Sequence, residues 1–141
     1  FEPWTSRPEF KGAGLSKTKR NLETLNCVTI IKCGKQNNSH VIKRILKDQY
    51  VDTSQSLSRN TFTNKDGVNR AQTTSTTLYS FARDSVLVGR EMLALQGQPT
   101  SLNVPEDTKE STLKELAGEG MAVPCVALML WSLHLTKQFP E

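Results

Sequence analysis

Hydrophobic and polar positions in the first half of the chain predict one strand and one amphipathic helix. The compact β-branched run CVTII lies within residues 25–33 and is followed by glycine and a polar stretch, which is typical of a buried strand. Apolar residues then recur at helical spacing, which predicts a helix over residues 40–50. The face opposite its apolar stripe would carry Lys43, Arg44 and Lys47.

The segment that follows is almost wholly polar and carries one clear turn signal. Asp66 and Gly67 suit a two-residue turn in which both residues take positive φ, so we predict a β-hairpin over residues 60–74. Phe62 would pair with Ala71 on one face of this hairpin. A disordered loop is the alternative for this segment.

The second half of the chain changes to a helical period. We expect helices over residues 77–96, 105–117 and 122–138. The first carries a broad apolar stripe and ends at Gly97, whereas the second is acidic at its start and has only a thin stripe. The third has Pro124 in its first turn and apolar residues on every side, so other helices of the domain or a partner must enclose it.

Residues 1–20 show no hydrophobic period and combine proline and glycine with basic side chains. We predict an extended basic arm, with residues 21–141 as the single globular domain. Trp4 and Phe10 would anchor this arm on a neighbouring surface, because isolated aromatic side chains are costly to leave in water. Packing of the arm on its own core is the alternative.

Length, composition and charge restrict the classes that remain. A chain of 141 residues with a moderate hydrophobic content can hold one core, and the order of its elements indicates an α+β fold with a mainly helical C-terminal half. Residues 1–70 carry a formal charge of +7 and residues 71–141 a charge of −3, for a total of +4. A basic N-terminal half favours a polyanionic partner.

No arrangement of residues predicts catalysis. The pair Cys125 and His134 would lie about 13 Å apart along one helix, and the chain has no motif for a metal, a phosphate loop or paired catalytic acids. We therefore expect no enzymatic activity, no catalytic residue, no metal and no cofactor. Three cysteines are too few for a disulfide framework, which favours a reduced intracellular compartment.

Two functional classes remain open. The first is a non-enzymatic nucleic-acid-associated structural subunit of the capsid, nucleocapsid or ribonucleoprotein type, with RNA as the expected polymer. Its phosphate contacts would come from Arg7, Lys11, Lys17, Lys19, Arg20, Lys43, Arg44, Lys47, Lys65 and Arg70. The second is a protein-interaction or scaffold subunit that binds no nucleic acid.

In either class we expect a homo-oligomer or a subunit of a larger assembly. The expected interface residues are Trp4, Phe10, Leu128, Trp131 and Leu135. The apolar run at the C-terminal end covers fifteen residues, fewer than the about 20 that a spanning helix needs, so we expect no membrane span.

Overall fold

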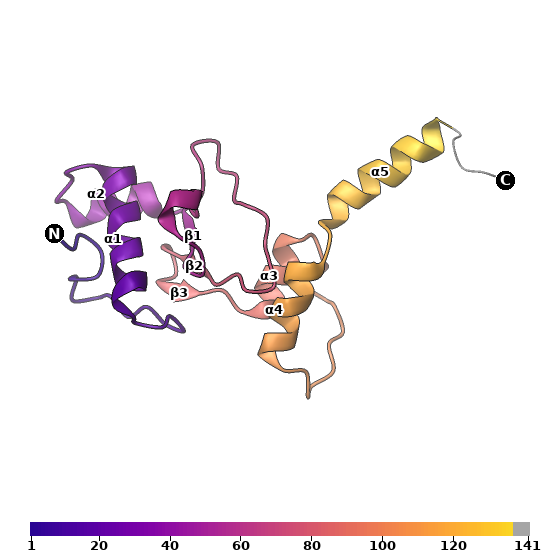
Figure 1. Cartoon of the computed structure of the whole chain (residues 1–141), viewed down its shortest axis with the longest axis horizontal. Coiled ribbons are helices and arrows are strands. Elements are labelled where there is room, and N and C mark those ends of the chain that lie inside the picture. The colour runs from indigo at the N-terminus through magenta and orange to yellow at the C-terminus, as the bar shows by residue number, and fades with distance from the viewer. Residues whose placement is uncertain (137–141) are drawn as a thin grey trace. The chain divides into compact units, whose positions relative to one another are not determined.

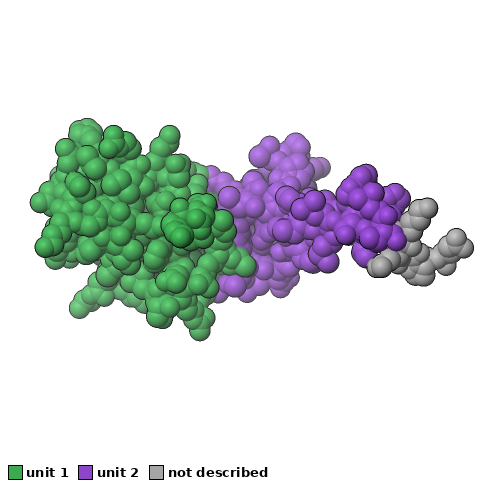
Figure 2. Space-filling view, turned by 90° about the horizontal axis from the view of Figure 1, so that it is seen from above, with its two compact units in different colours: residues 1–71, 76–87 green, residues 72–75, 88–141 purple. Residues whose placement is uncertain are grey.

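The computed structural model describes residues 1–136 and has the predicted α+β fold with a mainly helical C-terminal half (Figure 1). Its elements are α1 (Lys19–Cys33), α2 (Ser39–Leu46), β1 (Tyr50–Asp52), the 3-10 helix η1 (Leu57–Arg59), β2 (Leu78–Ser80), β3 (Ser85–Val86), α3 (Gly89–Leu95), α4 (Glu110–Glu119) and α5 (Val123–Leu135). By their internal contacts these elements form two compact units (Figure 2). Unit 1 comprises Phe1–Ala71 and Thr76–Leu87, and unit 2 comprises Gln72–Ser75 and the chain from Val88 onward.

Unit 1 contains a three-stranded antiparallel sheet in the order β1-β2-β3. Tyr50 lies opposite Ser80, and Tyr79 lies opposite Val86. One hydrophobic core joins this sheet to α1, α2 and the N-terminal segment. Its buried members are Trp4, Leu15, Leu25, Val28, Cys33, Ile42, Leu46, Val51, Tyr79, Phe81 and Val86.

The strand predicted for residues 25–33 is wrong, because this segment is the second half of helix α1. The Thr18 side chain accepts a hydrogen bond from the Asn21 amide and caps the helix, which ends before Gly34 at a positive φ of 61°. The hydroxyl of Thr29 donates to the Leu25 carbonyl within the helix. Buried β-branched residues are therefore accommodated here without a strand, and tertiary packing overrides their local preference.

The arm predicted for residues 1–20 is also wrong, since the segment packs on unit 1. Trp4 and Leu15 are buried in the core, and Ala13 forms a parallel bridge with Ser85. The last two residues of the predicted arm already belong to α1. The Trp4 side chain and the backbone of this segment thus have their partners within unit 1, in agreement with the alternative that the arm packs on its own core.

Neither the hairpin predicted for residues 60–74 nor its two-residue turn forms as expected, because Gly67 has a positive φ but Asp66 does not. The Asn64 amide donates to the Val68 carbonyl across Gly67, which has a φ of 79°. The flanking residues pair elsewhere: the Thr63 amide donates to the Tyr50 carbonyl, so this stretch runs beside β1. A polar segment with little apolar area gains more from an existing strand than from pairing with itself.

The helix predicted for residues 77–96 is correct only in its last part, which is α3. Its first part forms the hairpin of β2 and β3, joined by a turn over residues 81–84. Asp84 takes a left-handed φ of 52°, which reverses the chain direction. Tyr79 and Phe81 are both buried. These apolar residues, predicted to lie on a helix, therefore contribute to the core from strand β2 and the turn that follows it.

The other predicted helices form with shifted ends. The helix of residues 40–50 is the shorter α2, and its last residues lead into β1. The helix of residues 105–117 is α4, which begins later because a turn occupies residues 105–108. The helix of residues 122–138 is α5, and the end of that prediction lies outside the described residues.

Unit 2 is built on a close approach of α3 and α4. Gly89 lies against the side chain of Leu113, and Gly118 lies against the backbone of Thr73 and Thr74. Met92 is fully buried in this unit. Helix α5 follows α4 after a short break, and none of its residues is buried.

Candidate nucleic-acid interface

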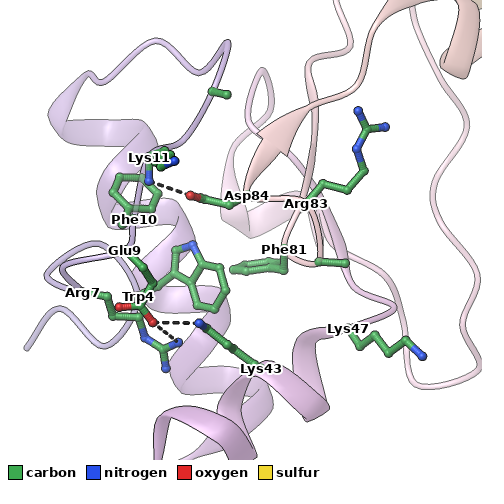
Figure 3. A pocket seen from close by; sticks show the side chains of 12 residues that line it. Trp4, Arg7, Glu9, Phe10, Lys11, Lys43, Lys47, Phe81, Arg83 and Asp84 are labelled. Carbon is green, nitrogen blue, oxygen red and sulfur yellow. Dashed lines mark hydrogen bonds and ion pairs between the residues drawn. The ribbon is translucent and has the colours of Figure 1, made fainter.

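A hollow of about 650 Å³ lies on unit 1, between the N-terminal segment, α2 and the turn that joins β2 to β3 (Figure 3). We call it the basic hollow, because five of its lining residues are cationic and two are acidic. The lining residues are Trp4, Arg7, Glu9, Phe10, Lys11, Ala13, Lys43, Lys47, Phe81, Ala82, Arg83 and Asp84. Their formal charge is therefore +3.

Helix α2 contributes two lysines to the hollow. Its first turn is capped by the Asn38 side chain, which accepts from two backbone amides. Ile42 and Leu46 face the core and are buried, so Lys43 and Lys47, each one residue further along, project from a neighbouring face. The amphipathic pattern of this helix thus places two cations one turn apart at the same hollow.

Asp84 holds the N-terminal segment against the β2–β3 turn. Its carboxylate accepts from the Lys11 amide at 2.6 Å and from the Gly12 amide at 3.2 Å. Its backbone carbonyl accepts from the Ala13 amide at 3.0 Å. These bonds explain why Lys11 reaches the hollow although it lies far from α2 in the sequence, and they also satisfy the Asp84 carboxylate.

An aromatic floor underlies the hollow. The Trp4 indole N–H donates to the Tyr79 hydroxyl at 2.9 Å, and that hydroxyl donates to Asp84. Trp4 and Phe81 pack edge to face, with ring centroids 4.9 Å apart. Burial and the bond to Asp84 raise the pKa of Tyr79 well above its ordinary value. The floor is therefore anchored by buried hydrogen bonds as well as by packing.

Glu9 is the counter-charge of two cations in the hollow. Its Oε1 lies 2.9 Å from the Lys43 ammonium nitrogen and 3.9 Å from Nη1 of Arg7, as the dashed lines in Figure 3 mark. The bond from Lys43 holds the pKa of Glu9 below its ordinary range. The carboxylate thus marks a position where negative charge is stabilised.

Arg7 is held rigidly at the edge of the hollow. Its Nε donates to the Pro3 carbonyl at 2.9 Å, and its guanidinium lies 4.8 Å from the centre of the Trp4 ring. Nη1 of Arg7 is buried and makes no hydrogen bond within the described residues 1–136. A cationic donor in this state favours an anionic oxygen that approaches from the hollow.

The structure brings together four of the ten predicted phosphate-binding residues at the hollow: Arg7, Lys11, Lys43 and Lys47. The six that do not line it are Lys17, Lys19, Arg20, Arg44, Lys65 and Arg70. Some of these have partners elsewhere: Lys19 pairs with Glu23, and Arg20 donates to the Ser54 carbonyl. The predicted basic set therefore divides into a cluster and scattered surface charges.

Three charged residues of the hollow were not expected from the sequence: Glu9, Arg83 and Asp84. Arg83 and Asp84 fall within the helix predicted for residues 77–96, whereas in the structure they lie in the turn between β2 and β3. An Arg-Asp pair after an alternating apolar stretch is compatible with a hairpin turn, and this signal could have located them. Glu9 has no local signal, because its role depends on Lys43.

The predicted interface residues fall into two groups. Trp4 is a core residue with 4% of its surface exposed, so its assignment to a partner surface is wrong. Phe10 is half-buried and lines the basic hollow. Leu128, Trp131 and Leu135 lie on α5 and are exposed by 69%, 62% and 64%. An apolar helix surface of this kind is open to a partner.

Two further features bear on the class of protein. No group of three metal-ligating side chains occurs among residues 1–136. One stretch of the described chain, Glu110–Leu135, is long and apolar enough to cross a membrane by length and composition alone. The structure divides it into α4 and α5 at residues 120–122. The absence of a membrane span therefore stays a prediction.

Comparison with known proteins finds no relative: no protein family, no curated protein and no solved structure matches this chain.

Proposed function

We propose that this chain is a non-enzymatic, nucleic-acid-associated structural subunit that binds phosphate groups at the basic hollow of unit 1. The observation that carries the proposal is that five cationic residues, from three separate segments, line one hollow. Scattered surface charges would give a diffuse positive field, whereas a cluster creates a local site for phosphate oxygens. RNA is the proposed polymer, and α5 is the proposed assembly surface.

A scaffold subunit without nucleic-acid binding is the second candidate. The exposed apolar surface of α5 favours it, because this surface requires a partner whatever unit 1 binds. The two candidates differ in one measurable property. Only the first predicts that affinity for nucleic acid falls steeply with salt concentration.

The test is binding of labelled single-stranded RNA and duplex DNA over a salt series. The variant Lys43→Gln/Lys47→Gln/Arg83→Gln should lower the slope of log affinity against log salt by up to about three units for duplex DNA and less for RNA. The matched control Lys19→Gln/Lys35→Gln/Lys65→Gln removes the same charge from exposed positions outside the hollow and should lower the slope less.

Equal losses of slope in the two triple variants would contradict the proposal, because net charge alone would then explain binding. No binding by the unmodified protein at low salt would favour the scaffold candidate. Circular dichroism of each variant establishes that the comparison is made between folded proteins.

A further inference from the structure

We propose, on the basis of the proposed function, that the basic hollow binds one unpaired nucleotide of a single strand. Its phosphate replaces the carboxylate of Glu9 between Arg7 and Lys43, and its base packs against the half-buried Phe10 inside the hollow.

The phosphate position follows from the contacts of Glu9. Its Oε1 serves both cations but reaches Nη1 of Arg7 only at 3.9 Å, beyond hydrogen-bond distance. In the part of the chain that the structure describes, that buried nitrogen has no hydrogen-bond partner. A phosphate group has more acceptor oxygens than one carboxylate and can bond to Lys43 and to Nη1 of Arg7 together. Exchange of Glu9 for phosphate therefore gives a hydrogen bond to a donor that has only a long ion pair in the free protein.

The space beside this position fits a base. The volume of about 650 Å³ lies within the range of sites for small molecules, which are mostly apolar with a few polar groups. Phe10 is half-buried and offers accessible aromatic surface on one side of the hollow, whereas Trp4 and Phe81 are only 4% and 3% exposed and are fixed in the core by their mutual packing. Such a surface accepts any base, because every base presents an apolar face.

The concave shape favours an unpaired nucleotide over a duplex. A base inside a duplex must be unstacked and unpaired before it can enter a hollow, which costs a few kcal/mol. A base in a single strand avoids most of that cost. The side chains of Lys47 and Arg83 extend outward from the aromatic floor, in position for the neighbouring phosphates of the same strand (Figure 3).

The test uses the full chain with Trp131→Phe, which leaves Trp4 as the only tryptophan and hence as a reporter of the hollow. Adenosine monophosphate should change Trp4 fluorescence saturably. Adenosine and inorganic phosphate should each bind at least about tenfold more weakly, since each lacks one of the two contacts. Calorimetric titration of the same ligands detects binding that leaves the fluorescence unchanged.

Two variants test the exchange with Glu9. Glu9→Gln removes the competing charge and should tighten adenosine monophosphate binding about threefold to tenfold. Lys43→Gln should weaken it about tenfold or more. The matched control Glu23→Gln makes the same change on an exposed acid outside the hollow and should have less than a twofold effect.

Several outcomes separate this inference from the proposed function. If neither fluorescence nor calorimetry detects adenosine monophosphate, or if Glu9→Gln behaves as Glu23→Gln, the nucleotide site is wrong. Binding of RNA with a slope that depends on the hollow would then still support the proposed function. If adenosine monophosphate binds but no strand does, the nucleotide site stands and the proposed function fails. Equal affinity for duplex and single strand overturns the preference for an unpaired nucleotide.

Discussion

At the residue scale, we expect Tyr79 to make unit 1 less stable as the pH rises into the alkaline range. Burial of the Tyr79 hydroxyl and the hydrogen bond to Asp84 raise its pKa above the ordinary value of 10, although the bond from the Trp4 indole acts in the opposite direction. The unfolded chain therefore loses this proton at lower pH than the folded chain does. The stabilisation is complete below about pH 10 and falls as pH rises, by at most about 1.4 kcal/mol per pH unit.

Urea unfolding between pH 8 and 11.5 checks this expectation. Tyr79→Phe should abolish the part of the pH dependence that the hydroxyl causes and should cost about 1–3 kcal/mol at neutral pH, because the Trp4 N–H and Asp84 lose a partner. Tyr50→Phe is the matched control, since Tyr50 is only half-buried. Identical pH profiles for the native protein and Tyr79→Phe would refute the role of this hydroxyl.

At the scale of elements, helix α4 packs so closely that a single methyl group cannot be added. A Cβ atom on Gly118 would lie 2.3 Å from the backbone of Thr73 and Thr74. Glycine to alanine in a helix ordinarily stabilises by about 0.5–1 kcal/mol. We expect Gly118→Ala to reverse this sign and to destabilise unit 2 by about 1–3 kcal/mol, because backbone atoms must move.

Hydrogen exchange of the α4 amides measures this effect within unit 2. Gly120→Ala is the control, since the nearest atom to its Cβ would be the Leu116 carbonyl oxygen at 3.0 Å. The α4 amides of Gly120→Ala should exchange at a rate closer to that of the unmodified protein than the α4 amides of Gly118→Ala do. Slower exchange of α4 in Gly118→Ala than in the unmodified chain would contradict the close approach.

At the scale of the whole molecule, we expect α5 to determine the state of association. Leu128→Asp or Trp131→Asp places a charge on a surface that is exposed within the chain, so each variant should stay folded. The unmodified protein should sediment as a species larger than 15.7 kDa and each variant as a monomer. Sedimentation velocity with circular dichroism measures both properties.

Leu113→Asp is the control for this comparison. Leu113 is buried in unit 2, and an unpaired charge there should cost several kcal/mol and unfold that unit. A monomeric native protein at tens of micromolar would contradict assembly through α5. If that monomer binds lipid vesicles through α5, the partner is a bilayer and the expectation of no membrane span is wrong.

The sequence by itself determined those features of the protein that follow from residues close together in the chain. Helix α2 follows from an amphipathic period after a capping residue, and its lysines follow from the same period. The apolar circumference of α5 is a matter of composition alone. The α+β class could also be predicted, because wrong assignments of individual segments left both kinds of element in the chain.

Only the tertiary structure decided what the basic hollow is. The bond from the Trp4 indole to Tyr79 joins residues 75 positions apart, and the bond from Lys11 to Asp84 joins residues 73 positions apart. A local sequence pattern does not predict which distant group will accept a hydrogen bond from a buried donor, because tertiary packing determines which groups lie close together. The same reason explains why an N-terminal segment without any hydrophobic period is part of the core, and why Glu9 lies between Arg7 and Lys43.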